Sequence, residues 1–293
     1  MFGWSLDQEG SEAVLDAYVA AGGNFIDTAD LYGRRGAGGS GSSEQIIGNW
    51  MAARGNRDSL VIATKVGMSE EHPGLSRQSI LRGAEDSLRR LRSDRIDLYY
   101  AHRDDPDTPL QETLSAFAEL IAAGSVRYVA ASNYSAARLA EALSVAEQEG
   151  LPAYVALQPN YNLLDRGEYE GELMALCERE QLACLPYFSL ARGFLTGKYR
   201  RGGAEIESPR AAGVRESYFN DRGFAVLAAL DQVAGEHDSS VAAVALAWLL
   251  AQPTVLAPIA SATSPAQLSE LMAAPALALT ADQLERLSRA AAT

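Results

Sequence analysis

The chain has 293 residues, of which 22% are charged, and its formal net charge is -13 at pH 7. This length is enough to bury a full hydrophobic core. The excess of acidic groups would repel phosphate backbones and anionic lipid headgroups, so we expect neither nucleic acid nor a membrane as partner. The longest strongly apolar run, residues 241–251, is far shorter than the roughly 20 residues of a membrane-spanning helix, which favours a buried helix.

Cysteine usage and the N-terminal residues indicate the compartment. Cys177 and Cys184 are the only cysteines, too few for a disulfide scaffold in a chain this long, and neither lies in a Cys/His cluster. The first ten residues already contain Asp7 and Glu9, unlike the charged-then-apolar pattern of a signal peptide. We therefore expect a cytoplasmic protein with no metal site.

Short β-branched runs alternate with helical patterns along the chain. The expected strands are residues 24–27, 60–65, 96–102, 126–132, 155–160, 182–187 and 255–259. Between them apolar residues recur at helical spacing. The capping-box patterns Ser42-x-x-Gln45 and Thr280-x-x-Gln283 predict two helix starts. Such alternation is typical of parallel βαβ units.

Polar residues gather where the expected strands end, and this decides between two architectures. Nearly continuous apolar strands such as residues 60–63 predict a sheet covered by helices, which a barrel and a doubly wound sheet satisfy equally. In a barrel the carboxyl ends of all strands form the mouth where active sites are built. We therefore predict an α/β fold, a (β/α)8 TIM barrel, with residues 1–293 as a single domain.

Lys65 is unusual because it and Lys198 are the only lysines of the chain, and because it ends an apolar strand. A strand-end ammonium can form a Schiff base or lower the pKa of a neighbouring group. Equally, the side chain can extend from the strand end into solvent. The residues alone leave these alternatives open.

Residues 25–33, FIDTADLYG, resemble the signature of the aldo-keto reductase family around its catalytic Asp and Tyr. The segments ATKVG at residues 63–67 and YAHRDD at residues 100–105 are similar to the family's catalytic lysine and histidine strands. Further similar segments follow in the same order, and the match to the bacterial-type members runs from about residue 1 to about residue 271. The resemblance implies an oxidoreductase that reduces aldehydes or ketones to alcohols by hydride transfer.

The resemblance also implies roles for four residues. Tyr32 would be the general acid that protonates the carbonyl oxygen, and Lys65 would lower the pKa of that tyrosine. Asp27 would keep Lys65 charged and oriented, and His102 would hydrogen-bond the same carbonyl oxygen. Trp4, Tyr32 and His102 would line the pocket of a small-molecule carbonyl substrate.

A nicotinamide cofactor is the second implication. The residues implied to bind it are Ser132, Asn133, Gln158, Tyr187, Leu190, Arg192, Gly193, Lys198, Ser261, Thr263, Ser264, Gln267 and Glu270. Ser264 stands where an arginine commonly clamps the 2′-phosphate, and losing a bidentate charged contact costs about 1.5 to 3 kcal/mol of preference. We expect NADPH, with NADH as the alternative.

The chain departs from the family pattern at its start. It begins at MFGW, which corresponds to the end of the first strand, so we expect that strand to be truncated and the N-terminal hairpin to be absent, naturally or through a mis-assigned start. The exposed sheet edge then needs a short strand, a covering segment or a partner. Assembly into a homo-oligomer is left open.

Two glycine-rich motifs are not interpreted as nucleotide sites. Residues 36–41 spell G-x-G-x-x-G but do not directly follow a strand, as the dinucleotide fingerprint requires. Residues 193–198 are one residue short of a P-loop. The alternatives to a reductase are a cofactor-binding, redox-sensing regulatory subunit with little turnover, and a Schiff-base lyase that uses Lys65.

Overall fold

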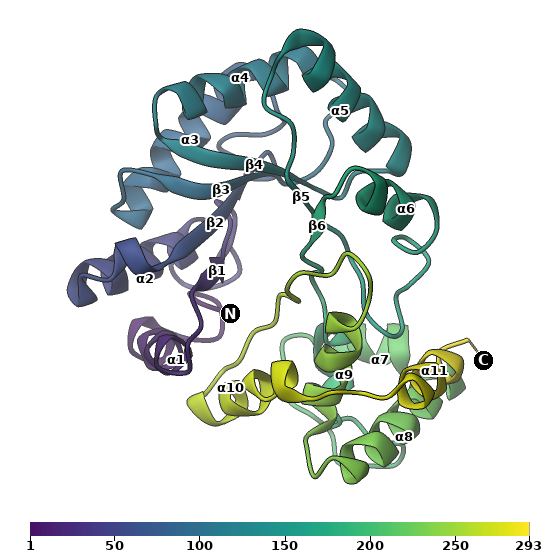
Figure 1. The fold of residues 1–293 in the computed structure, drawn as a ribbon. Helices are drawn as coiled ribbons and strands as arrows, with labels where there is room; N and C mark the ends of the chain where they lie inside the picture. The colour runs from purple at the N-terminus through teal and green to yellow at the C-terminus, as the bar shows by residue number, and fades with distance from the viewer. Residues whose placement is uncertain (293) are drawn as a thin grey trace. The chain divides into compact units, whose positions relative to one another are not determined.

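The computed structural model describes residues 1–292, and it divides into two compact units, which we describe one at a time. Unit 1 comprises residues 1–158 and 261–265, and unit 2 comprises residues 159–260 and the C-terminal residues from 266 on. Helices and strands alternate along the chain (Figure 1).

Unit 1 holds five parallel strands that lie side by side in chain order. They are β1 (Phe25–Asp27), β2 (Val61–Val66), β3 (Ile96–Ala101), β4 (Val126–Ser132) and β5 (Ala156–Gln158). The helices that accompany them are α1 (Gln8–Ala20), α2 (Ser42–Arg54), α3 (Arg77–Leu91), α4 (Leu110–Ala122) and α5 (Ala136–Glu149), with the short 3-10 helix η1 (Arg57–Ser59). β3 is buried along its whole length, as expected for a strand covered on both faces.

The sequence predicted the strands of unit 1 closely. The strand expected at residues 126–132 is confirmed over its full length as β4, and the first three differ from expectation by one residue at one or both ends. The strand expected at residues 155–160 is wrong at its end, because β5 stops at Gln158. Pro159 follows and has no backbone N–H to donate to a ladder.

The two predicted helix starts had different outcomes. Thr280 and Gln283 form the expected capping box, with the Gln283 side chain accepting from the Thr280 amide at 2.9 Å. The helix predicted at Ser42 does begin there, as α2, but the capping box is wrong, because Ser42 is already helical and Gly41 is the N-cap. Gly41 has a φ of 77°, a left-handed conformation that glycine adopts readily.

The truncated first strand is confirmed: within residues 1–292 no strand precedes α1, and residues 1–7 hold only an isolated bridge between Phe2 and Leu6. The outer edge of β1 is covered by a side chain of α1. The hydroxyl of Tyr18 donates to the Phe25 carbonyl at 3.0 Å and accepts from the Phe25 amide at 3.3 Å. This phenol therefore satisfies the two backbone groups that a neighbouring strand would otherwise bind.

Unit 2 is mostly helical. Its elements are β6 (Ala183–Cys184), α6 (Glu172–Arg179), α7 (Ala211–Tyr218), α8 (Asp221–Glu236), α9 (Val241–Leu250), α11 (Ala281–Ala290), and the 3-10 helices η2 (Ala191–Thr196) and η3 (Ala274–Ala276); α10 (Pro265–Met272) begins at the boundary of the units. The apolar α9 packs against α8, which also contacts α11. The buried helix predicted at residues 241–251 is thereby confirmed.

The two strands expected in unit 2 are much shorter than predicted. The one at residues 182–187 is reduced to β6, and the one at residues 255–259 to an isolated bridge between Cys184 and Val255. Hydrogen bonds from Leu256 to Cys184 and from Ile259 to Pro186 still hold the two segments together, at 2.9 and 2.8 Å. Prolines at positions 186 and 258 remove backbone donors, which prevents a regular ladder.

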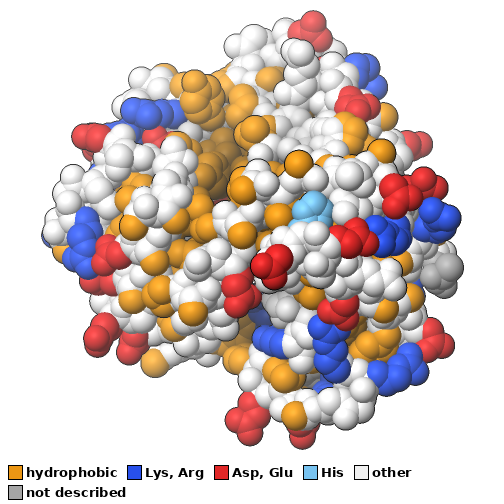
Figure 2. Space-filling view, turned by 60° about the horizontal axis from the view of Figure 1, so that its bottom comes forward, with side chains coloured by type: hydrophobic (Ala, Val, Ile, Leu, Met, Phe, Trp, Pro, Cys, Tyr) orange, Lys and Arg blue, Asp and Glu red, His pale blue; other side chains and the backbone are white. Residues whose placement is uncertain are grey.

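The fold class is as predicted: an α/β protein with the alternating parallel strands and helices of a (β/α)8 barrel whose first strand is truncated. No helix among residues 1–292 combines the length and the apolar character needed to cross a membrane. On the face in Figure 2, acidic and basic side chains are interspersed with apolar ones.

Candidate active site

The strand ends of unit 1 bring the predicted polar residues to one edge of the sheet. Asp27 ends β1, Lys65 lies near the end of β2, and His102 follows β3 directly. Ser132 ends β4 and Gln158 ends β5, and these two residues are paired in register. Because the strands are parallel, their carboxyl ends meet at the same edge.

Lys65 is the centre of this group. Its side chain is fully buried, and the ammonium donates to Asp27 Oδ2 at 2.6 Å, to the Thr28 carbonyl at 2.8 Å and to Tyr32 Oη at 3.4 Å. These three acceptors match the three protons of an ammonium group. Burial is the largest influence and lowers the pKa of Lys65, but the Asp27 carboxylate and the Tyr32 phenol together outweigh it, so the pKa is raised. Lys65 is therefore a buried cation.

Asp27 is held through both of its carboxylate oxygens. While Oδ2 accepts from Lys65, Oδ1 accepts from the Gln158 amide nitrogen at 2.8 Å. A carboxylate bound on both sides keeps one orientation, which fixes the direction of the Lys65 ammonium. The structure thus brings Gln158, which the sequence assigned to the cofactor, into contact with the predicted catalytic group.

Tyr32 and His102 face each other beside the ammonium. Their rings are 5.9 Å apart and nearly perpendicular, and Lys65 Nζ lies 4.7 Å from the centre of the Tyr32 ring. His102 is 7% exposed, and its Nδ1 has no hydrogen-bond partner among the described residues. Burial, together with the positive charges of Lys65 and Arg103, lowers the pKa of His102 well below its ordinary value. His102 is therefore a neutral imidazole at pH 7.

Asn133 connects the ends of β3, β4 and β5. Its amide nitrogen donates to the His102 carbonyl at 2.9 Å and to Ser132 Oγ at 3.0 Å, and Ser132 Oγ donates to the Gln158 carbonyl at 2.8 Å. Asn133 has a φ of 56°, a left-handed conformation that asparagine adopts more easily than most residues. These hydrogen bonds fix the rim of the sheet on which the predicted nicotinamide contacts lie.

The remaining predicted cofactor residues belong to other segments. Ser261, Thr263 and Ser264 lie in the short segment of unit 1 ahead of α10, and Gln267 and Glu270 are exposed residues of α10. The others are in unit 2, around η2: Tyr187, Leu190, Arg192, Gly193 and Lys198.

Within unit 2, η2 contains a tight left-handed turn. Arg192 and Gly193 have φ values of 57° and 99°, and Ala191 before them has 47°. The Arg192 guanidinium lies 4.9 Å from the centre of the Phe188 ring, and its Nε has no hydrogen-bond partner among residues 1–292. Burial and the nearby Arg210 lower the pKa of Lys198. The guanidinium groups of Arg192 and Arg210 stay charged, because arginine is not deprotonated in proteins. This part of unit 2 therefore carries positive charge, as an anion-binding segment requires.

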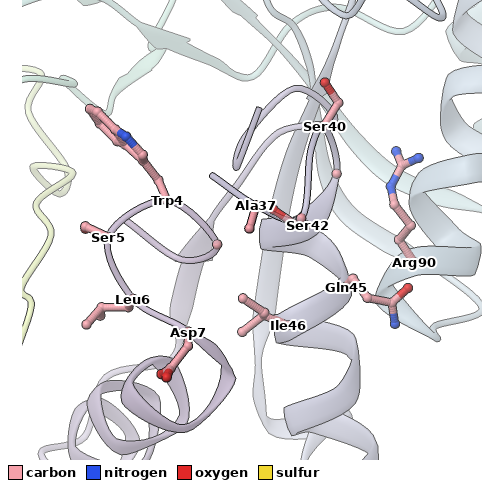
Figure 3. Close-up of a pocket in the computed structure, with 13 residues that line it drawn as sticks. Trp4, Ser5, Leu6, Asp7, Ala37, Ser40, Ser42, Gln45, Ile46 and Arg90 are labelled. Atoms are coloured by element: carbon pink, nitrogen blue, oxygen red, sulfur yellow. The ribbon is translucent and has the colours of Figure 1, made fainter. Parts of the chain in front are cut away.

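Trp4 lines a separate hollow of unit 1. The hollow has a volume of about 690 Å³, and Trp4 shares it with residues of the glycine-rich loop and of α2 (Figure 3). In Figure 3 the Trp4 indole points away from Gln45 and Ile46, and the Arg35 guanidinium lies 5.6 Å from the centre of the indole. Neither Tyr32 nor His102 lines this hollow, so a pocket formed by Trp4, Tyr32 and His102 stays a prediction.

Sequence reasoning missed a buried hydrogen-bond network behind these residues. Thr64 Oγ1 donates to Glu44 Oε1 at 2.5 Å, and Arg90 Nε donates to Glu44 Oε2 at 2.7 Å. From the same helix start, Ser43 accepts from Thr28 Oγ1 at 2.9 Å. The sequence offered one indication of this network, which is Thr64, a polar residue directly before Lys65 in a mostly apolar strand.

One group of described residues has ligand atoms close enough together to hold a metal ion: Glu71, His72 and Asp86. Asp86 already binds His72 Nε2 and the Arg89 guanidinium, each at 2.7 Å. Ion pairing accounts for this cluster, and no predicted catalytic or cofactor residue belongs to it.

Comparison with known proteins places these observations in context. The model of the "Aldo/keto reductase family" matches residues 1–292. A rice protein named "Probable voltage-gated potassium channel subunit beta" is 35% identical, over 93% of this chain and 84% of its own length. "Aldo-keto reductase ausK" of Emericella nidulans is 33% identical, over 97% and 72%. "L-glyceraldehyde 3-phosphate reductase" of Escherichia coli O157:H7 is 30% identical, over 89% and 78%.

Proposed function

Because the chain belongs to the aldo/keto reductase family, we propose that it is an NADPH-dependent carbonyl reductase with Tyr32 as its general acid. The observation that supports this most directly is the Lys65 ammonium, which contacts the Asp27 carboxylate on one side and the Tyr32 hydroxyl on the other. A small aldehyde or ketone is the substrate class, and the reaction forms the corresponding alcohol.

The proton in this reaction comes from Tyr32. A free tyrosine has a pKa of about 10 and is a weak donor at neutral pH. The Lys65 ammonium stabilises the tyrosinate that remains when the proton moves to the carbonyl oxygen. Asp27 keeps Lys65 charged, and Gln158 keeps Asp27 in place, so the group that favours the tyrosinate is oriented before the substrate arrives.

His102 assists as a hydrogen-bonding group. A neutral imidazole can donate one hydrogen bond to the carbonyl oxygen without delivering a proton to it. The lowered pKa of His102 is consistent with that role, since a second buried cation would lie beside Lys65. Tyr32 is therefore assigned as the acid and His102 as the residue that orients the carbonyl.

A nicotinamide cofactor would supply the hydride when bound. In unit 1, Ser132, Asn133 and Gln158 would hold the carboxamide. In unit 2, Arg192, Gly193 and Lys198 would hold the phosphates, because the two basic side chains add positive charge and Gly193, in a left-handed turn, presents no side chain that would block the approach. NADPH is the proposed cofactor, and NADH is the alternative because Ser264 replaces the expected arginine.

The proposal is tested by turnover of a broad aldehyde such as 4-nitrobenzaldehyde with NADPH and with NADH. Tyr32→Phe should lose about 10²- to 10⁴-fold in kcat and still bind cofactor, as judged by a fluorescence titration. Tyr128→Phe is the matched control, since Tyr128 is 59% exposed on β4. Wild-type turnover by Tyr32→Phe would refute the assignment of the acid.

A second candidate is a redox-sensing regulatory subunit, and the potassium channel β subunit among the relatives favours it. Such a protein would bind NADPH tightly and turn over no aldehyde in a broad panel. The Schiff-base lyase is less well supported, because a nucleophilic amine must be unprotonated and the pKa of Lys65 is raised. Borohydride trapping of a carbonyl adduct on Lys65 would support the lyase.

The proposal extends to the organisation of the protein. Residues 1–293 would act as one barrel domain in the cytoplasm, without nucleic acid or membrane as partner. Size-exclusion chromatography with light scattering measures whether the protein forms a homo-oligomer.

A further inference from the structure

Asp30 lies in the segment between two of the catalytic residues, Asp27 and Tyr32. Its backbone amide donates to the Lys65 carbonyl at 3.2 Å, and the Tyr32 amide donates to the Ala29 carbonyl at 3.0 Å, which closes a turn around Asp30. The residue is only 2% exposed. A change at Asp30 therefore acts on the turn that carries the Tyr32 side chain.

The Asp30 carboxyl is buried without a hydrogen bond of ordinary geometry, although the Ser69 hydroxyl and the Leu31 amide lie close enough to act weakly on it. Neither of its oxygens has a hydrogen-bond partner among the described residues, and the same is true of the fully buried Tyr99 hydroxyl. A carboxylate in such surroundings loses its hydration without replacement, which costs several kcal/mol. A neutral, protonated carboxyl avoids that cost.

The neighbouring charges also disfavour a carboxylate at Asp30. Glu44 is fully buried, and Arg90 is already hydrogen-bonded to it. Of these three groups, Asp30 and Glu44 are carboxyls and Arg90 is the one guanidinium, which is bound to Glu44. Burial chiefly, and then the charge of Glu44, raise the pKa of Asp30 to about 7, against the weaker opposing effects of the Ser69 hydroxyl and Arg90.

Several elements pack around this carboxyl. The titratable, charged or polar groups that face it or its neighbours are Ser43 and Glu44 from α2, Thr64 from β2, Ser69 from the following loop, Asp86 and Arg90 from α3, and Tyr99 from β3. Arg90 is the only cation among them, against the carboxylates of Glu44 and Asp86, so the cluster is already negative and becomes more so when Asp30 ionises.

We infer that Asp30 is a positioning residue, and that its protonated carboxyl keeps the turn of residues 28–32 in the conformation that places Tyr32 against Lys65. Ionisation drives the carboxylate toward water or toward Arg90, and the turn moves with it. The contact most exposed to such a shift is the one between Tyr32 Oη and Lys65 Nζ, because at 3.4 Å it is the longest of the three that the ammonium makes. This inference rests on the proposed role of Tyr32.

The test is the pH profile of kcat/KM for aldehyde reduction between pH 5.5 and 9. In the wild type, kcat/KM should fall about tenfold per pH unit above pH 7, through the titration of one group. Asp30→Asn, which is isosteric and cannot ionise, should remove this fall and leave kcat/KM at pH 6 within about threefold of the wild type. Asp94→Asn is the matched control, because Asp94 is an exposed partner of Arg95.

A second variant keeps the inference testable if Asp30→Asn does not fold. Glu44→Gln removes the neighbouring negative charge and releases Arg90 toward Asp30, so the fall in kcat/KM should begin at a lower pH. A folded Asp30→Asn protein with the wild-type pH profile overturns the inference, and so does a Glu44→Gln profile that is unshifted or shifted to higher pH.

A readout without turnover separates this inference from the proposed reaction. The pKa of the Tyr32 phenol, measured as the difference in ultraviolet absorption between wild type and Tyr32→Phe, should depend on Asp30 whether or not the protein is a reductase. An inactive protein in which Asp30→Asn still shifts the Tyr32 titration would contradict the proposed function alone. An active protein in which the Tyr32 titration ignores Asp30 would contradict the inference alone.

Discussion

The Asp27 carboxylate and the Lys65 ammonium form an ion pair at 2.6 Å in which neither side chain is more than 5% exposed. A buried pair of this kind is costly to break, because the remaining partner is left as an uncompensated charge. The same ammonium contacts the Tyr32 hydroxyl, which is the proposed proton donor.

Asp27→Asn should reduce kcat at least tenfold, because the neutral amide no longer holds Lys65 as a cation beside Tyr32. The free energy of unfolding should fall by about 3 to 5 kcal/mol, as is typical when one partner of a buried pair is removed. Urea unfolding and steady-state kinetics measure the two effects. An Asp27→Asn protein with wild-type kcat would show that the charge of Lys65 is unimportant for turnover.

Stability should also depend on pH through Asp30. Its pKa is about 7 in the folded protein, against 3.8 for an ordinary aspartate such as that of the unfolded chain, so between these values the folded protein holds a proton that the unfolded chain has released. The free energy of unfolding should therefore be highest below pH 4 as far as Asp30 is concerned, and fall by up to about 4 kcal/mol as the pH rises to 7. Comparing Asp30→Asn with wild type by urea unfolding at pH 5 and pH 8 isolates this contribution, and an equal difference at both pH values would contradict it.

Tyr18→Phe should destabilise the edge of β1, because it leaves both the amide and the carbonyl of Phe25 without the phenol that binds them. Loss of these hydrogen bonds should cost about 1 to 3 kcal/mol. Chemical denaturation measures the loss, with the exposed Tyr128→Phe as control. The variant should also self-associate more readily, because its strand edge is open to pairing.

Two glycines inside helices should respond in opposite directions to substitution by alanine. In α2, a Cβ at Gly48 would lie 2.2 Å from the Arg90 carbonyl oxygen, so Gly48→Ala should force α2 and α3 apart and destabilise by about 1 to 3 kcal/mol. In α8, a Cβ at Gly235 would meet nothing within 4 Å, so Gly235→Ala should stabilise by about 0.5 to 1 kcal/mol. Thermal unfolding of the two variants checks both signs.

Ser264→Arg should increase the preference for NADPH over NADH. A guanidinium bound to the 2′-phosphate contributes about 1.5 to 3 kcal/mol, which corresponds to roughly ten- to 150-fold in the ratio of kcat/KM values. Ser264→Gln, which adds length without charge, is the control. An unchanged ratio would place the 2′-phosphate away from this residue.

The sequence predicted unit 1 better than unit 2 for a physical reason. The strands of unit 1 are regular, apolar and bounded by polar residues, so each pattern corresponds to one element, as β4 illustrates. In unit 2 the segments before and after residue 186 keep a strand-like composition, but prolines at positions 186 and 258 interrupt their pairing. The amino-acid composition of a segment does not show over how many residues the segment pairs with a neighbouring strand.

The candidate site was predictable where single residues match a motif, and not where a contact joins distant segments. The motif around Asp27 and Tyr32 indicated the residues that surround Lys65 in the structure. Asp30 lies within that motif, but nothing in the motif indicates its burial or the influence of Glu44 and Tyr99, which belong to later elements. The bond between Gln158 and Asp27 joins residues 131 positions apart, and no local pattern indicates it.

The complete burial of Lys65 has a practical consequence for labelling this protein. Lys65 and Lys198 are the only lysines, and only Lys198 has an exposed side chain. An amine-reactive dye applied to the folded protein therefore meets one lysine, besides the N-terminal amine. That lysine lies in the segment proposed to bind the cofactor phosphates, so we expect a dye attached to Lys198 to report cofactor binding.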